Sequence, residues 1–188
     1  KQNCALPGEG TNIPVWILGS SLFGAQLAAH LGLPYAFASH FAPEQLEQAL
    51  SIYRERFRPS PWGQKPYAVL AANVFAADDA GEAAYLRTTM QLAFARLRTG
   101  QPGKLPRPVR DIDAEIGAQM RQAVDGALRI SAVGDRERVR DQLSRLVETY
   151  RPDEVILTGQ IHDHTARLRS FEIAAEAASS LPPVRKAA

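Results

Sequence analysis

Short, continuous apolar runs alternate along the chain with stretches in which apolar residues recur every three or four positions. The runs lie at residues 14–18, 34–39, 67–75 and 154–158, and their length and content predict strands buried on both faces. The intervening stretches predict helices, because apolar residues at that spacing line one face of a helix. Strands and helices that alternate in this way are typical of an α/β protein with a parallel sheet.

Capping residues set the expected ends of the helices. The first helix is predicted at residues 22–31, with Ser20 or Ser21 as its N-cap and Gly32 as its C-cap. Further helices are predicted at residues 43–57, 78–98, 115–124, from 134–135 onward, and 163–178. Residues 100–111 are rich in proline and glycine, so we expect them to leave the sheet as a surface excursion.

The composition is that of an ordinary globular protein, with 45% hydrophobic and 22% charged residues, and residues 1–188 are predicted to form a single domain. Lys and Arg total 22 against 20 for Asp and Glu, a balance that does not favour nucleic-acid binding. We recognise neither a membrane span nor a signal peptide. Cys4 stands alone, which excludes an internal disulfide and favours a reducing, cytoplasmic location. The chain does not begin with Met, and its first residues read like a loop from inside a longer protein.

Gly19, Ser20 and Ser21 lie where the first predicted strand ends and the first helix begins. The unpaired N–H groups and positive dipole at a helix N-terminus attract anions, glycine permits close approach, and serine hydroxyls add donors. Phosphate binding is one interpretation of this turn, and plain N-capping by one serine is the other. The turn is not a Walker loop, because no Lys-Ser/Thr pair follows Gly24, and it lacks the middle glycine of a dinucleotide fingerprint.

His40 follows the second predicted strand. The carboxyl ends of parallel strands line the ligand site of α/β proteins, and histidine titrates near neutral pH, so His40 is the candidate acid or base. The alternative is a loop histidine bonded to the backbone. His162 and His164 begin a predicted helix, in which positions i and i+2 diverge, so we expect Asp163 to be an N-cap and no metal to bind there.

Several blocks of the sequence resemble the luciferase-like flavin-dependent monooxygenases. The blocks are PVWILGSS at 14–21, AQLAA at 25–29, LGLPYAFASHF at 31–41, DEVILT at 153–158, DH at 163–164 and RLRS at 167–170. The last three are similar to the final strand and helix of that family. The resemblance extends over about residues 5–180.

The resemblance implies a (β/α)8 barrel that binds reduced FMN, or a related deazaflavin, and uses it with oxygen or for hydride transfer. It also implies that Gly19, Ser20 and Ser21 grip the phosphate of the cofactor. The predicted strands would be the fifth to eighth of the barrel. The expected fold class is therefore α/β, with parallel (β/α) units forming the C-terminal half of a TIM-type (β/α)8 barrel, since a whole barrel takes about 250 residues.

Two functions of different kinds fit these observations. The first is a flavin-dependent monooxygenase that inserts oxygen into a small organic substrate, with His40 as its acid–base candidate. The second is a non-catalytic flavin- or phosphate-binding protein, or a structural half-barrel that dimerises. A flavodoxin-like or Rossmann-like nucleotide binder is a weaker third reading, because Ser39 and His40 stand where it would need an acidic residue.

The expected partners follow from the half-barrel. Its first and last strands would each lack a neighbour and expose unpaired N–H and C=O groups. We therefore expect association with a second copy of the chain or with a missing N-terminal half, besides the small-molecule substrate. Neither nucleic acid nor membrane is an expected partner.

Overall fold

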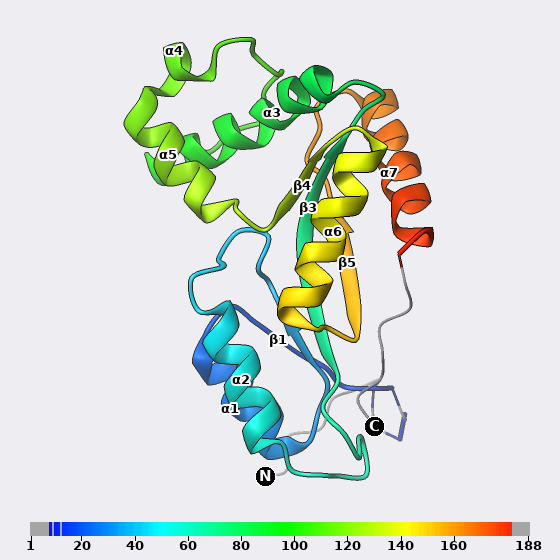
Figure 1. Ribbon diagram of the computed structural model, residues 1–188. Coiled ribbons are helices and arrows are strands. Elements are labelled where there is room, and N and C mark those ends of the chain that lie inside the picture. The colour runs from blue at the N-terminus through cyan, green and yellow to red at the C-terminus, as the bar shows by residue number, and fades with distance from the viewer. Residues whose placement is uncertain (1–7, 9, 12, 182–188) are drawn as a thin grey trace.

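The computed structural model describes residues 8, 10–11 and 13–181, which form a parallel sheet with helices packed on it (Figure 1). The strands are β1 (Ile17–Gly19), β2 (Tyr35–Phe37), β3 (Ala68–Ala76), β4 (Ser131–Gly134) and β5 (Glu154–Thr158). The helices are α1 (Leu22–Leu31), α2 (Leu46–Arg56), α3 (Ala80–Arg98), α4 (Ile112–Ile116), α5 (Ala118–Ala127), α6 (Arg136–Tyr150) and α7 (His164–Ser179). The predicted α/β class with parallel strands is confirmed. Cys4 lies outside the described residues.

Strand β3 is the centre of the five-stranded sheet, whose order is β1-β2-β3-β4 with β5 also paired to β3. Asn73 of β3 is in register with Ser131 of β4 and with Thr158 of β5, so β4 and β5 lie on opposite edges of β3. Strand β2 pairs with the beginning of β3 and β4 pairs with its end. Within the described residues β1 pairs only with β2, and β5 only with β3, so the two free edges predicted from the sequence are present.

The structure corrects several predicted strand boundaries. Strand β1 begins at Ile17 rather than at residue 14, because the first ladder bond is donated by the Ile17 N–H to the Pro34 carbonyl. Strand β2 is confined to Tyr35–Phe37. Strand β4 was not predicted at all, since its four residues, SAVG, are too short and too small to form a recognisable apolar run.

Two helix predictions are also corrected. Helix α2 begins at Leu46, not at residue 43, because residues 43–45 form a turn in which the Leu46 N–H bonds the Pro43 carbonyl. The single helix predicted at 115–124 is two helices, α4 and α5, which meet at Gly117. The φ of Gly117 is +75°, a left-handed value that a continuous helix does not allow.

Gly32 and Asp163 occupy the cap positions predicted for them, and two further aspartates also cap helices. The carboxylates of Asp79, Asp135 and Asp163 accept hydrogen bonds from backbone amides in the first turns of α3, α6 and α7. Gly32 ends α1 with a φ of +63°, and a Cβ at this position would lie 2.3 Å from the Arg58 carbonyl oxygen. Glycine is therefore required at this position both for its conformation and for the space it leaves.

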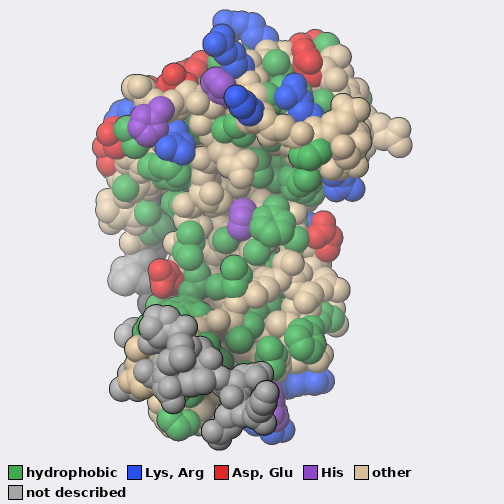
Figure 2. Space-filling model, turned by 180° about the vertical axis from the view of Figure 1, so that it is seen from behind, with side chains coloured by type: hydrophobic (Ala, Val, Ile, Leu, Met, Phe, Trp, Pro, Cys, Tyr) green, Lys and Arg blue, Asp and Glu red, His purple; other side chains and the backbone are tan. Residues whose placement is uncertain are grey.

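The two faces of the sheet differ in what covers them. Alternate residues, among them Tyr35, Leu70 and Val74, form an outer face buried against α1, α2, α6 and α7. The opposite, inner face carries Leu18 and Ile156, which are 73% and 51% exposed. Figure 2 views the molecule from behind, where apolar side chains gather across its middle.

Helices α3 and α5 cover only the carboxyl-terminal end of the inner face. Phe75 and Val133 lie there and pack against Leu86, Val124 and Leu128. In Figure 1 this helical arm extends sideways from the end of the sheet that is remote from α1 and α2. The inner face is thus closed at one end and open in its middle.

Candidate functional site

The turn of Gly19, Ser20 and Ser21 joins β1 to α1, as predicted. Ser21 occupies the N-cap position with an extended backbone (φ −140°, ψ 167°), but its side chain makes no capping hydrogen bond. Both serines are exposed. Plain capping by a serine hydroxyl is therefore not what the structure shows, and these hydroxyls are available to a ligand.

Tyr35 holds the turn through its hydroxyl and its ring. Its hydroxyl donates to the Ser21 carbonyl at 3.2 Å, and its ring fits the close crossing of strand and helix. A Cβ at Gly24 would lie 3.4 Å from that ring and 3.5 Å from the Cα of Gly19, so small residues keep the crossing tight. Burial raises the pKa of Tyr35 to about 12, so its hydroxyl stays protonated and remains a donor.

Gln45 also holds the turn, and the sequence did not reveal it. Its Oε1 accepts a hydrogen bond from the Leu22 N–H, the first amide of α1, at 3.2 Å. Gln45 ends the connection from β2 to α2, which also contains His40, and Arg129 fixes this connection by donating to the Pro43 carbonyl at 2.7 Å. The turn and His40 therefore share one supporting segment, although no described hydrogen bond joins them directly.

His40 lies just beyond the carboxyl end of β2, beside the inner face. Asn73 of β3 donates from its Nδ2 to the His40 carbonyl at 2.6 Å, and Ser39 donates from its hydroxyl to the Ala71 carbonyl. The residues after β2 are thus bonded twice to β3. Asn73 is 1% exposed and was not predicted as a site residue.

The His40 ring is half-buried. Its Nδ1 is buried and has no hydrogen-bond partner among the described residues, and the Oδ1 of Asn73 shares this condition. The ring packs edge-on against Phe41, with centroids 4.6 Å apart. Desolvation by burial lowers the pKa of His40 below 6.5, which favours the neutral imidazole at neutral pH. Among the residues that the structure describes, no backbone group bonds the His40 Nδ1, so a loop histidine held to the backbone through this nitrogen is not observed.

His162 and His164 have separate protein contacts. The Nδ1 of His162 lies 3.0 Å from the Leu105 carbonyl, which ties the excursion at residues 100–111 to the segment after β5. The Nδ1 of His164 lies 3.0 Å from Nη2 of Arg167. The described residues contain no cluster of three metal-ligating side chains, and the absence of a metal at these histidines stays a prediction.

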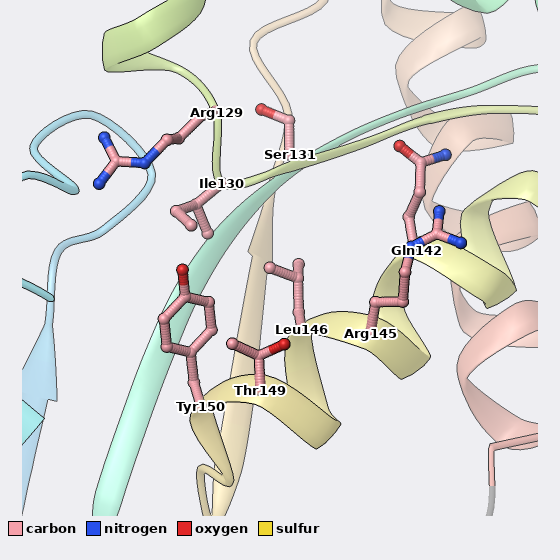
Figure 3. Close-up of a pocket in the computed structure, with 8 residues that line it drawn as sticks. All are labelled: Arg129, Ile130, Ser131, Gln142, Arg145, Leu146, Thr149 and Tyr150. Atoms are coloured by element: carbon pink, nitrogen blue, oxygen red, sulfur yellow. The ribbon is translucent and has the colours of Figure 1, made fainter. Parts of the chain in front are cut away.

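Two cavities are lined by residues other than those of the turn and His40. One, of about 270 Å3, lies beside α6, and the residues around it are Arg129, Ile130, Ser131, Gln142, Arg145, Leu146, Thr149 and Tyr150 (Figure 3). The guanidinium of Arg129 extends to the left in Figure 3 and donates a hydrogen bond to the Pro43 carbonyl. A second cavity, of about 520 Å3, lies between α2 and α6 and shares Thr149 and Tyr150. The candidate chemistry is at the strand ends, not in these cavities.

The sheet is built of parallel (β/α) units, and a helix N-terminal turn and a histidine follow the carboxyl ends of neighbouring strands. This architecture is that of the (β/α)-barrel class, in which active sites lie at the carboxyl ends of the strands. The chain belongs to the luciferase-like monooxygenase family, whose sequence profile, described as "Luciferase-like monooxygenase", matches residues 2–151. The family resemblance inferred from the sequence is confirmed. No helix of the described residues is long and apolar enough to cross a membrane.

Two relatives show the extent of the match. A luciferase-like monooxygenase of Escherichia coli K12 is 49% identical over 176 residues, which are 94% of this chain and 52% of that protein. The uncharacterized protein YvbT of Bacillus subtilis 168 is 40% identical over 172 residues, which are 92% of this chain and 51% of that one. The chain therefore spans about half the length of the curated relatives it matches.

Solved structures agree on the fold. The crystal structure of apo-MsnO8 matches with a TM-score of 0.74 and 32% identity, over 90% of this chain and 52% of that one. The long-chain alkane monooxygenase LadA matches with a TM-score of 0.54 and 17% identity, over 87% of this chain and 40% of that one, which supports the fold alone. The chain forms half of a TIM-type barrel, as expected.

Proposed function

We propose that the protein is a flavin-dependent monooxygenase that uses reduced FMN and oxygen to insert one oxygen atom into a small organic substrate. Family membership supports the general activity. The observation that carries the cofactor assignment is the turn before α1, where two exposed serine hydroxyls lie at a helix N-terminus and the N-cap Ser21 makes no capping bond with its side chain.

The residues of the turn fit the phosphate of FMN. Gly19 lets a ligand approach the backbone, and Ser20 and Ser21 donate hydrogen bonds from their hydroxyls. The Oε1 of Gln45 is the one acceptor bonded to the first amide of α1, and its side chain would move or turn its amide when an anion binds. A deazaflavin carrying a phosphate meets the same donors, so this turn does not discriminate between the two cofactors.

When bound, the reduced flavin supplies the electrons for oxygen chemistry. His40 lies on the neighbouring strand end and supplies a neutral imidazole, which accepts or returns a proton. The arm of α3 and α5 covers the carboxyl end of the inner face and keeps water from that end of the site. These roles rest on the positions of the residues at the carboxyl ends of β1, β2 and β3.

The second candidate is a non-catalytic flavin- or phosphate-binding protein, or a structural half-barrel that dimerises. The open inner face favours it, because Leu18 and Ile156 are exposed there and both end strands of the described sheet have a free edge. Closure by a second copy, or by the other half of a barrel, would bury these side chains and pair these edges.

Oxygen consumption separates the two candidates. The purified protein is mixed with photoreduced FMN, and oxygen uptake is followed with and without small organic substrates such as alkanals, ketones and sulfides. The monooxygenase proposal expects substrate-dependent product formation that His40→Gln reduces. Tight FMN binding without product from any substrate would favour the non-catalytic candidate, and failure to bind FMN would contradict both flavin-dependent forms.

A further inference from the structure

Two buried polar atoms at the site are unpaired, and they belong to residues already in contact. The Oδ1 of Asn73 and the Nδ1 of His40 have no hydrogen-bond partner in the described part of the chain. Asn73 nevertheless contacts His40, because its Nδ2 donates to the His40 carbonyl at 2.6 Å. A buried polar atom without a partner is unfavourable, so two such atoms on residues that are in contact call for a common explanation.

The orientation of the Asn73 amide is fixed by its donor. Nδ2 has two acceptors nearby, the His40 carbonyl at 2.6 Å and the Ser131 hydroxyl oxygen at 3.4 Å. The Ser131 hydroxyl itself donates to the Leu128 carbonyl, so its oxygen remains free to accept. Turning the amide over would place Oδ1 against the His40 carbonyl, which is repulsive. Oδ1 can therefore act only as an acceptor, and it needs a donor.

His40 can provide that donor in only one of its neutral forms. A neutral imidazole carries its proton on Nδ1 or on Nε2, and the hydrogen bond made by one nitrogen selects the form. With the proton on Nε2, both buried atoms would be acceptors and neither would be satisfied. With the proton on Nδ1, the ring offers a donor that the Asn73 Oδ1 can accept, either directly after the ring rotates or through one shared water.

We infer that Asn73 is a positioning residue that holds the His40 proton on Nδ1 and thereby presents the Nε2 lone pair to the ligand as a base. Of the two ring nitrogens of His40, Nδ1 is the one that is buried without a partner among the described residues, which leaves Nε2 as the nitrogen assigned to the ligand. The inference rests on the proposed role of His40 in the monooxygenase. It adds the direction of proton transfer, because a ligand bound at Nε2 must be a proton donor, such as a hydroxyl or an N–H group.

The tautomer of His40 is measured directly by long-range 1H–15N NMR of the full-length protein, with His40→Gln used to assign its signals. The expected wild-type spectrum shows a pyrrole-type Nδ1 and a pyridine-type Nε2. In Asn73→Leu, which removes both amide groups at similar volume, the Nε2-protonated form should become dominant. Ser131→Ala removes the second acceptor of Asn73 but leaves His40 alone, so its spectrum should match the wild type.

A purely structural Asn73 would lower stability in Asn73→Leu without changing the tautomer, and that result would overturn the inference. A wild-type His40 protonated on Nε2 would overturn it as well, even if the leucine variant failed to fold. If the protein proves to be a monooxygenase, Asn73→Leu should lower kcat by about 100-fold with KM little changed. The NMR spectrum reports the His40 tautomer whether or not the wild type is an active enzyme. Failure of the inference and failure of the proposed function are therefore separate results.

Discussion

Replacing the two serines of the turn should weaken FMN binding without weakening the fold. The hydroxyls of Ser20 and Ser21 are exposed and Ser21 makes no capping bond, so Ser20→Ala/Ser21→Ala removes donors to a ligand but no described side-chain bond of the protein. Tyr35 and Gln45 hold the backbone of the turn and remain in place. Affinity and stability are thereby separated in one variant.

The size of the effect follows from the number of donors lost. A hydrogen bond to a charged oxygen contributes about 1.5–3 kcal/mol, so two such bonds contribute about 3–6 kcal/mol. Since each 1.4 kcal/mol changes a dissociation constant about tenfold, FMN should bind roughly 100-fold to 10,000-fold more weakly. Unfolding free energy should change by less than about 0.5 kcal/mol, as for exposed side chains without partners.

Fluorescence quenching of FMN and of riboflavin, with urea unfolding of each variant, checks both halves of the prediction. Riboflavin lacks the phosphate, so its affinity should be the same in wild type and variant. Asp135→Ala is the matched control, because this N-cap does accept a bond from the Arg138 amide, and its loss should cost about 0.5–2 kcal/mol of stability. Equal FMN affinity in wild type and serine variant, or an equal loss for riboflavin, would refute the phosphate role of the turn.

Three further predictions concern pH, backbone and assembly. Burial lowers the pKa of His40 below 6.5, so the unfolded chain binds a proton at His40 more readily than the folded protein does. The contribution of neutral His40 to the free energy of unfolding should therefore be complete above about pH 6.5 and fall as the pH drops through the lower pKa of the folded state. Urea unfolding between about pH 5 and 8 should show a flatter dependence on pH in His40→Gln than in the wild type. Gly32→Ala should lower the free energy of unfolding by more than about 1–3 kcal/mol, because the φ of Gly32 is +63° and the new Cβ would meet the Arg58 carbonyl. Gly126→Ala has open space around it in α5, so it should be neutral or stabilising. Thermal unfolding of both variants checks the difference. Light scattering of this chain should show a dimer or an aggregate formed through its free strand edges, and a monodisperse species of 20.6 kDa would contradict the need for a partner.

The sequence predicted those parts of the fold that local chemistry specifies. Apolar runs gave the long strands, and aspartates at helix starts gave the caps, because a short side chain that accepts an amide bond acts within three residues. Strand β4 was not predicted because its sequence, SAVG, contains no apolar run. These four residues form a strand because they pair with the edge of β3, a contact that the local sequence does not reveal. The break between α4 and α5 at Gly117 was not predicted because glycine occurs within helices as well as between them.

The candidate site was predicted in part, for a similar reason. Gly19 to Ser21 and His40 were found because each follows a recognisable strand, and strand ends are where α/β proteins place their chemistry. Tyr35 and Gln45, which hold the turn, act through contacts between elements far apart in the sequence. Nothing in the local pattern around either residue marks such a contact.

Asn73 was not predicted as a site residue, although the sequence contains a feature that could have identified it. It is the one polar residue within the apolar run Ala68–Ala76, and asparagine is depleted in strands. A buried amide must find hydrogen-bond partners, so its presence there already predicted a polar neighbour. What the sequence could not provide was the face, because both faces of β3 are buried and its pattern does not alternate. Only the register with Ser131 and Thr158 places Asn73 on the inner face, and its 2.6 Å bond to the carbonyl of His40 makes it part of the site.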